Sequence, residues 1–423
     1  MILDFFYLFA AVLLLPWFAY RRFIKRKQSA PLREKLGHIP ERDGSKKRIW
    51  IHAVSVGEAA AVEVLLKALR EKMPDADVVI STTTVTGQSV AAKRYGTEKV
   101  FYYPLDLSGA VKRALDRVKP AVLVLMELEV WPNMTAECAR RGIPVVVVNG
   151  RVTERAARRY ARFWFLVGPS FHRIKRWLVQ SDEYATRLKS LGVKPDAIEI
   201  SGNIKYDAID TKLVDERSKI RKSLGIAADS PVFLGGSTHP SEEASLLAAY
   251  KTLREKTPAL RLILVPRHPE RSADVEAEIK AAGLAPLRLS VLHEKTQHSG
   301  LSTQDFVLLV DTVGVLKDMY KAADVAFVGG SLIPHGGQNV MEPCGLGVAV
   351  VHGPHMHNFN DAMEILRECK GSVEVSRESL AGEIEKLLLD PVGANAMAQR
   401  AREGFIAKQG ATKRAVEYIA GLM

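Results

Sequence analysis

Along this chain of 423 residues, segments with apolar residues at helical spacing alternate with short segments that are apolar throughout. In residues 58–73 the apolar residues recur at helical spacing, and Pro74 ends that segment. Residues 121–126 and 144–148 are instead almost continuously apolar, which is typical of strands buried on both faces of a parallel sheet. The pattern therefore predicts an α/β protein in which helices cover parallel sheets.

The predicted elements fall into two series. The first contains predicted strands at 48–56, 78–82, 100–103, 121–126 and 144–148. The second contains predicted strands at 232–234, 260–265, 306–310, 325–328 and 348–351, each followed by a helical stretch. We expect a membrane anchor at 1–25 and two Rossmann-like domains, at 26–208 and 209–423, that face each other across a cleft. A last helix from about residue 395 is expected to pack back on the first domain.

The first twenty residues predict contact with a membrane. Ile2–Tyr20 is almost entirely apolar, with Asp4 as its only charge, and is close to the roughly 20 residues that cross a bilayer as a helix. Basic residues follow the segment rather than precede it, which argues against a secretory signal and holds the rest of the chain on the cytoplasmic side. The alternative is a helix lying in the membrane interface.

Composition narrows the class of protein further. The net charge of +12 suits an anionic membrane surface or anionic small substrates, and no finger motif or basic-aromatic platform points to nucleic acid. Cys138, Cys344 and Cys369 are widely spaced and form neither a zinc pattern nor a disulfide framework.

Three carboxylates at predicted strand ends, and one lysine between the two predicted domains, are candidates for chemistry. Glu58 follows a strand and a permissive Gly57, and could act as a base, although an acidic residue in a first helical turn also simply complements the helix dipole. Glu127 and Glu129 share one face at the end of an apolar strand, where they either function or pair with Arg151 or Arg155. Lys205, in the interdomain segment, could neutralise a leaving phosphate or simply be solvated.

Candidate anion-binding residues gather in the second series. Arg267 and His268 follow a strong strand, where they suit phosphate or carboxylate, or are solvated charges. Val313-Gly314-Val315 begins another predicted helix, and a helix N-terminus with glycine is a ready phosphate site.

The strongest signal is Gly329-Gly330-Ser331 followed by Gly336-Gly337-Gln338-Asn339. Paired glycines let backbone amides approach a phosphate, and Glu342 could accept hydrogen bonds from a ribose. The stretch is neither a Walker A loop nor a GxGxxG fingerprint, so hydride transfer is disfavoured. A late histidine cluster lacks metal-ligand spacing, and no metal site is expected, although one or two of its members could lie near the ligand: His335, His352, His355 and His357.

Together these motifs resemble the 3-deoxy-D-manno-octulosonic acid (Kdo) transferases. The resemblance spans nearly the whole chain in order and rests on residues 52–58, 126–133, 202–207, 265–271 and 327–342. It implies a GT-B glycosyltransferase that transfers Kdo from CMP-Kdo to a lipid A precursor, lipid IVA, in lipopolysaccharide biosynthesis at the inner membrane. It implies that the transfer inverts the anomeric centre of the sugar. No cofactor, metal, nucleic acid or obligate protein partner is expected for such an enzyme.

The resemblance also implies roles for single residues. Glu58 is implied as the general base, and Glu127 and Lys205 as supports of the transition state. The implied substrate-binding residues are Arg151, Arg267, His268, Val313, Gly314, Val315, Gly330, Ser331, Asn339, Val340, Met341 and Glu342. The chain departs from the family pattern at Val315, where a glutamate is usual, and at Gly150, where an alanine is usual.

Two alternatives stay open at this point. A GT-B transferase that uses a UDP-sugar and a lipid-linked acceptor would share the fold and the anchor. A membrane-tethered, two-lobed binding protein without catalysis is the alternative outside the enzymes.

Overall fold

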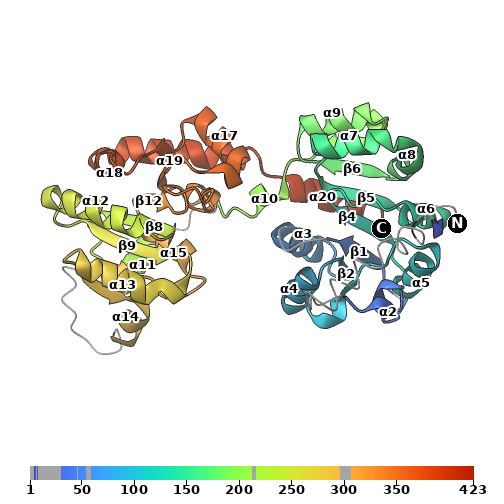
Figure 1. Ribbon diagram of the computed structural model, residues 1–423, viewed down its shortest axis with the longest axis horizontal. Helices are drawn as coiled ribbons and strands as arrows, with labels where there is room; N and C mark the ends of the chain where they lie inside the picture. Colours follow the sequence, from blue (N-terminus) through green and yellow to red (C-terminus); the bar gives the residue numbers. More distant parts are fainter. Residues whose placement is uncertain are drawn as a thin grey trace. The chain divides into compact units, whose positions relative to one another are not determined.

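The computed structural model describes residues 4, 5, 7, 30–44, 46–53, 59–211, 216–295 and 306–423. The chain divides into two compact units: Met1–Ala208 with Lys408–Met423, and Ile209–Ala407. Each unit contains one seven-stranded sheet with helices around it (Figure 1). All strand pairs in both sheets are parallel, so the prediction of two parallel-sheet α/β domains is confirmed.

The sheet of the first unit has the strand order β3-β2-β1-β4-β5-β6-β7. Six of these strands follow the order of a dinucleotide-binding Rossmann sheet, and β7 extends one edge. The strands are β1 (Arg48–His52), β2 (Asp77–Thr82), β3 (Val100–Tyr102), β4 (Val122–Met126), β5 (Val145–Gly150), β6 (Arg176–Val179) and β7 (Ile198–Ile200). Every residue of β1, β4 and β5 is buried, as expected for central strands covered on both faces.

Helices cover both faces of this sheet. One hydrophobic cluster contains residues of α5, α6, α8 and α9, and the other contains residues of α3, α4 and α20. The helices of the unit are α2 (Leu32–Lys35), α3 (Ala59–Lys72), α4 (Val85–Tyr95), α5 (Ser108–Val118), α6 (Pro132–Arg140), α7 (Glu154–Arg162), α8 (Trp164–His172), α9 (Asp182–Ser190), α10 (Ile204–Asp207) and α20 (Ala411–Ala420).

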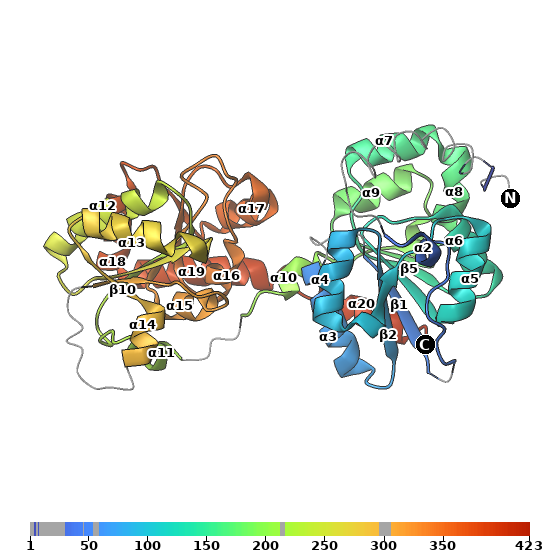
Figure 2. The same ribbon diagram turned by 60° about the horizontal axis from the view of Figure 1, so that its bottom comes forward.

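The end of the chain contributes to the first unit rather than to the second. Ala411, Ala415, Val416 and Ile419 of α20 lie buried in the same cluster as Leu65 of α3. Figures 1 and 2 both show α20, in red, beside the strands of this sheet. Its apolar face therefore helps α3 to cover this face of the sheet.

The predicted membrane segment, Ile2–Tyr20, lies almost wholly outside the described residues. Of its members, Asp4 accepts hydrogen bonds from the Ser108 amide at 2.9 Å and from Asn133 Nδ2 at 3.0 Å, and Tyr7 donates to Asp106 at 3.1 Å. Among the residues that the structure describes, no helix has both the length and the apolar character needed to cross a membrane.

The sheet of the second unit has the strand order β10-β11-β9-β8-β12-β13-β14. Its strands are β8 (Val232–Thr238), β9 (Arg261–Pro266), β10 (Ala285–Arg288), β11 (Phe306–Leu309), β12 (Val325–Val328), β13 (Ala349–His352) and β14 (Val373–Glu374). One cluster packs the sheet against α12, α13, α18 and α19, and the other packs it against α14 and α15, with α11 alongside.

The helices of this unit are α11 (Arg217–Ser223), α12 (Glu242–Lys256), α13 (Ser272–Ala281), α14 (Leu289–Lys295), α15 (Leu316–Ala322), α16 (Met341–Gly345), α17 (Asn360–Cys369), α18 (Leu380–Leu389) and α19 (Pro391–Ile406).

The packing of α20 predicts the effect of a truncation in its core face. Ile419 is fully buried, whereas Leu32 on α2 of the same unit is 65% exposed. Ile419→Ala should lower the free energy of unfolding of the first unit by about 2–5 kcal/mol, because it leaves a cavity. Leu32→Ala is the matched control and should change it by less than about 0.5 kcal/mol. Urea unfolding followed by tryptophan fluorescence measures both, and equal midpoints for the two variants would contradict the assigned packing.

Candidate functional site

In both sheets the strand order reverses at one point, and several of the described candidate residues directly follow strands near it. In the second sheet the chain runs from β8 to one side and later continues from β12 on the other. Open α/β sheets bind ligands at such a point, outside the carboxyl ends of the strands. The strands β11, β9, β8 and β12 are neighbours in the sheet. The loops that follow them therefore bring Arg267, the 313–315 turn and the 329–342 loop together along one edge, which is formed by the carboxyl ends of these strands.

Glycines near the ends of β8 and β12 allow the two strand ends to touch. The amide of Gly329 donates to the Gly236 carbonyl at 2.8 Å. A Cβ atom at position 329 would lie 2.1 Å from the Ser237 carbonyl oxygen, and one at 236 would lie 2.3 Å from the Tyr320 hydroxyl. Close backbone approach therefore requires these glycines, independently of any ligand.

A buried carboxylate joins the two strand ends. Glu242, the first residue of α12, is fully buried. Its Oε2 accepts the amides of His239 at 2.9 Å and Gly330 at 2.7 Å. Its Oε1 accepts the amides of Ser331 and Leu332, both at 3.0 Å. Burial raises the pKa of Glu242, although the four amides act against that shift.

This arrangement changes the expected role of the Gly-Gly-Ser motif. The amides of Gly330 and Ser331, which the sequence suggested as a phosphate cradle, point into the protein at Glu242. Ser331 is fully buried, its hydroxyl accepts the Gly353 amide at 2.8 Å, and its carbonyl accepts the His355 amide at 3.0 Å. Gly330 has φ of 68°, a conformation that glycine adopts without strain.

The following loop folds back over this turn. The amides of Gly337 and Gln338 donate to the carbonyls of Gly330 and Gly329, at 2.8 and 3.0 Å. Asn339 then accepts the Met341 amide at 3.1 Å through its side chain, at the start of α16. Val340 and Met341 are buried, and burial raises the pKa of Glu342, with Lys317 opposing the shift. The loop thus has a fixed shape before any ligand binds.

Three imidazole rings gather beside this loop. The His239 ring lies 4.1 Å from His335 and 6.2 Å from His268, centroid to centroid, and its Nε2 lies 3.0 Å from Gln338 Nε2. Burial, followed by the nearby His335, lowers the pKa of His239 to about 4. His239 is therefore neutral at pH 7 and can accept a hydrogen bond from the Gln338 amide. Among the described residues, no group of His, Cys, Asp and Glu has a geometry that holds a metal ion.

The basic side chains that follow β9 differ in their surroundings. Arg271 is held by Glu243 at 2.8 Å, and this carboxylate also accepts the Thr238 hydroxyl at 2.9 Å. Arg267 and His268 have exposed side chains, and the Arg267 amide donates to the Thr238 carbonyl at 3.0 Å. The strand ends therefore fix the backbone of Arg267 and leave its guanidinium exposed at the edge that carries the 329–342 loop.

The turn at Val313, Gly314 and Val315 lies after β11. Val313 is 79% exposed, and Gly314 has φ of 88°. Val315 occupies the position before α15 without a side-chain cap. The turn therefore presents backbone rather than a side-chain carboxylate at this edge of the sheet.

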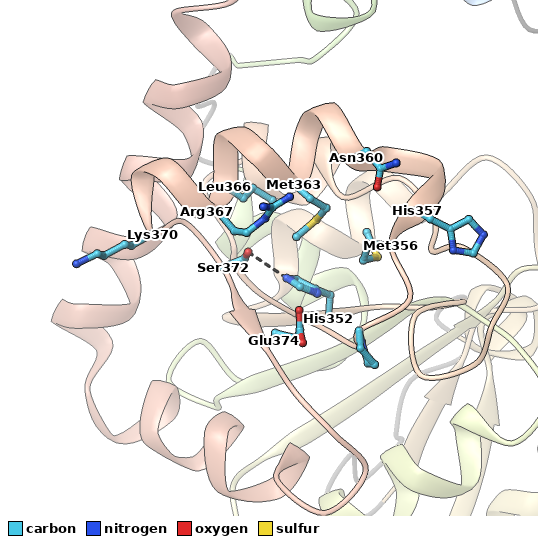
Figure 3. Close-up of a pocket in the computed structure, with 11 residues that line it drawn as sticks. His352, Met356, His357, Asn360, Met363, Leu366, Arg367, Lys370, Ser372 and Glu374 are labelled. Carbon is cyan, nitrogen blue, oxygen red and sulfur yellow. Dashed lines mark hydrogen bonds between the residues drawn. The ribbon is translucent and has the colours of Figure 1, made fainter.

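A cavity of about 460 Å³ adjoins the 329–342 loop (Figure 3). It lies between α17 and the ends of β13 and β14, and none of the residues predicted to bind substrate lines it. His352 accepts or donates a hydrogen bond with Ser372 at 3.2 Å, drawn as a dashed line in Figure 3. Met356, another lining residue, packs under Gly337, where a Cβ atom would lie 2.3 Å from its sulfur. His352 and His357, two members of the late histidine cluster, therefore lie here.

In the first unit, two strand ends carry strained residues. Glu127 after β4 has φ of 56°, and Asn149 at the end of β5 has φ of 58°. Left-handed backbone at a non-glycine residue costs energy and gathers at functional sites. Arg151 follows β5 with an exposed side chain. Glu58, the predicted base, lies outside the described residues.

Lys205 sits in α10, and hydrogen bonds hold the start of this short helix. Asn149 Oδ1 accepts the Ile204 amide at 3.1 Å, and Asn203 Oδ1 accepts the Lys205 amide at 3.0 Å. Asn203 in turn donates to Gln180 at 3.0 Å. The strained residue at the end of β5 thereby fixes the backbone next to Lys205.

The other end of α10 is held by α20. Asp207 accepts the amides of Gly410 and Thr412, both at 2.6 Å, at the N-terminus of α20. Gln409 donates to the Tyr206 carbonyl at 2.9 Å, and Arg414 donates to the Ser201 carbonyl at 3.0 Å. Lys205 is therefore carried by a segment fixed at both ends within the first unit.

Sequence reasoning missed His239 and Glu242, which the geometry makes central to the second unit. His239 lies shortly after the strand predicted at 232–234, and this position was its only signal. Glu242 resembles any acidic residue in a first helical turn. Three of the four amides that Glu242 accepts come from residues about ninety positions later in the sequence. The two rings beside His239, those of His268 and His335, are also distant from it in the sequence.

Comparisons with known proteins agree on one family. A family model described as 3-Deoxy-D-manno-octulosonic-acid transferase (kdotransferase) matches residues 30–208. The 3-deoxy-D-manno-octulosonic acid transferase of Haemophilus influenzae is 33% identical over 379 residues, which cover 88% of this chain and 86% of that protein. The protein of the same name from Bordetella pertussis is 33% identical over 382 residues, which cover 87% and 86%.

A solved structure extends the likeness to the fold. The UDP-GlcNAc 2-epimerase of Neisseria meningitidis, bound to UDP-GlcNAc, matches with a TM-score of 0.56 at 13% identity, over 88% of this chain and 100% of that one. At this identity the match shows the fold alone. The sequence matches show more: the chain belongs to the 3-deoxy-D-manno-octulosonic acid transferase family.

The hydrogen bonds of Glu242 predict that its replacement by glutamine, which has nearly the same shape but no charge, loosens the contact between the ends of β8 and β12. Glu242→Gln should turn an NH₂ group toward two of the four amides and lower the free energy of unfolding of the second unit by about 1–3 kcal/mol for each amide left without an acceptor. Glu255→Gln, at an exposed position on the same helix, is the control and should have no effect. Hydrogen exchange at residues 330–332 measures the loss of protection directly. Unchanged exchange in the Glu242 variant would refute the assigned role.

Proposed function

We propose that this protein transfers Kdo from CMP-Kdo to a lipid A precursor, lipid IVA, in lipopolysaccharide biosynthesis. Membership in the Kdo transferase family supports the reaction class, and the chemistry of the second unit supports the donor. The observation that carries the proposal is the edge formed after β8, β9 and β12. It presents Arg267 and His268 beside a neutral His239 and a preformed glycine loop.

That edge suits the phosphate of a nucleoside monophosphate. Because Glu242 occupies the amides of Gly330, Ser331 and Leu332, side chains supply the anion contacts there. Arg267 offers a guanidinium fork, and His268 and His239 offer imidazole donors. The backbone at Val313–Val315 and the segment Asn339–Glu342 complete the proposed CMP site, with Glu342 accepting hydrogen bonds from the ribose. Gly330 and Ser331 shape this site from behind.

We assign the acceptor to the first unit and the donor to the second, in the GT-B manner. In sequence terms the domains are the anchor at 1–25, the acceptor domain at 26–208 and the donor domain at 209–423. The final helix, α20, packs on the acceptor domain.

The proposed reaction assigns one step to each of these residues. The carboxylate of Glu58 removes the proton from an acceptor hydroxyl as its oxygen forms a bond to the anomeric carbon of Kdo. The bond from that carbon to the phosphate oxygen breaks, and its electron pair leaves with CMP. Arg267 and His268 stabilise the charge on the departing phosphate, so the step needs no metal. Glu127 and Lys205 support the transition state, and Arg151 binds a substrate carboxylate. Attack opposite to the leaving group inverts the anomeric centre.

We further propose that residues 1–25 anchor the protein at the inner membrane, with both domains on the cytoplasmic side. The apolar run Ile2–Tyr20 and the basic residues after it support this placement. The acceptor is a lipid, so an enzyme held at the bilayer meets it at the surface in which it is dissolved.

Two alternatives make different predictions. A transferase for UDP-sugars would bind UDP in preference to CMP, and calorimetric titration with both nucleotides separates the two cases. A binding protein without catalysis would return the acceptor unchanged. The decisive assay incubates the purified full chain with CMP-Kdo and the tetraacyl disaccharide acceptor and reads the product mass. Gain of one or more Kdo residues supports the proposal, and an unchanged acceptor mass contradicts it.

The proposed base predicts a separation of binding from turnover. Glu58→Gln should keep CMP affinity and lower the transfer rate about 10²–10⁴-fold, because the amide cannot accept the proton. Glu63→Gln, at an exposed position of α3, should transfer at the wild-type rate. Transfer by the Glu58 variant at the wild-type rate would remove Glu58 from the mechanism.

The depressed pKa of His239 predicts a link between donor binding and protons. A bound phosphate favours the charged imidazole and should raise this pKa from about 4. CMP binding near pH 5 should therefore take up more protons in the wild type than in His239→Gln, and the difference should vanish at pH 8. Calorimetry in buffers of different ionisation enthalpy measures the uptake. Equal uptake at pH 5 would show that His239 does not sense the phosphate.

A further inference from the structure

The helical hairpin of α7 and α8 on the first unit carries a surface that the transfer reaction does not use. Figures 1 and 2 both show these helices side by side. We call its outward side chains the hairpin patch, which consists of Arg155, Arg158, Arg159, Arg162, Phe163 and Phe165. All six side chains are exposed.

The inner face of the hairpin is an ordinary packed face. Ala157, Tyr160, Trp164 and Val167 contact the hydrophobic cluster of the first sheet. The rings of Tyr160 and Trp164 lie 5.1 and 5.3 Å from that of Phe171, both in edge-to-face geometry. The hairpin is thus firmly seated, and its outward face is not needed to hold it in place.

The outward face combines cations with apolar rings. Phe165 is 82% exposed and Phe163 is 47% exposed. Residues 151–175 contain seven arginines and lysines, which are Arg151, Arg155, Arg158, Arg159, Arg162, Arg173 and Lys175, against one acidic residue, Glu154. Glu154 pairs with Arg158 at the surface. The guanidinium of Arg162 lies 6.0 Å from the Phe163 ring, so charge and ring share one surface.

A surface of this chemistry suits an anionic bilayer. Arginines near a surface of anionic lipids each contribute roughly fivefold to binding, and aromatic rings enter the headgroup region beside them. A basic face that was only solvated would not need two exposed phenylalanines. A protein partner would pair acidic groups with individual arginines, whereas a lipid surface is flat and meets all of the arginines and both rings together.

We propose that the hairpin patch lies on the anionic phospholipid surface and inserts Phe163 and Phe165 into the headgroup region. This contact orients the first unit at the membrane. It rests on the membrane association in the proposed function and does not depend on the transfer reaction.

A fluorophore on the hairpin tests this contact in the full chain. Phe165→Cys, in a Cys369→Ser background that leaves only the buried Cys138 and Cys344, carries an NBD label, and Leu389→Cys on α18 carries the control label. The proteins are reconstituted into vesicles of phosphatidylcholine, with and without roughly one-third phosphatidylglycerol. The label at 165 should shift to shorter wavelength and be quenched by lipid-bound quenchers only with phosphatidylglycerol, and the label at 389 should not respond.

Added salt and substitutions of the arginines test whether electrostatic attraction causes the response of the label. Salt at about 1 M, where the Debye length is about 3 Å, should reverse the response at 165. Arg158→Glu with Arg162→Glu should abolish it, and Arg158→Gln with Arg162→Gln, which adds no repulsion within α7, should weaken it. A label at 165 that behaves alike in both lipids, or that stays immersed in the double glutamate variant, would overturn the proposal. A response that appears only when the lipid A acceptor is added would also overturn it and assign the patch to the acceptor.

The transfer assay keeps this proposal separate from the proposed function. With acceptor dispersed in detergent, the double glutamate variant should transfer Kdo at the wild-type rate. A wild-type protein that transfers nothing, yet shows the lipid response at 165, would refute the function and leave the membrane contact standing. Loss of transfer in the variant alone would mean that the patch binds acceptor rather than bilayer.

Discussion

The carboxylate of Glu242 is the constraint on which the second unit of this protein depends. It accepts four backbone amides from the ends of β8 and β12, the two strands at which the sheet order reverses. Burying a carboxylate is costly unless hydrogen bonds compensate it, and here the compensation comes from the turn that shapes the ligand edge. The glycines at these strand ends let the backbones approach, and Arg267 and His268, which follow the adjacent strand β9, stay exposed.

Much of the fold could be predicted from the sequence, because central strands of parallel sheets are apolar along their whole length. The runs at 121–126 and 144–148 correspond to β4 and β5, buried at every residue. The strands that escaped prediction, β6, β7, β10 and β14, are short, and β7, β10 and β14 form sheet edges with partly exposed residues, so their pattern carries little signal. Local sequence also could not show that the last helix packs beside α3, since that contact joins residues more than three hundred positions apart.

The residues of the candidate site also differ in whether local sequence could identify them. Residues that directly follow a strand, such as Arg267 and Glu127, could be selected from the sequence because strand ends are where α/β sheets bind ligands. The Gly-Gly-Ser motif was also selected, but with the amides in the wrong direction, since their partner Glu242 lies about ninety residues earlier. His239 and the fixation of Lys205 by Asn149 and Asp207 arise only when distant strand ends and α20 meet.

The central claim is that side chains, rather than the amides of the Gly-Gly-Ser turn, hold the phosphate of the donor. A crystal structure of the full chain with CMP tests it most directly. We predict phosphate oxygens within hydrogen-bond distance of Arg267 and the imidazoles after β8 and β9, with Glu242 still bound to the amides of Gly330, Ser331 and Leu332. A phosphate that accepts those three amides, with Glu242 displaced, would contradict the account.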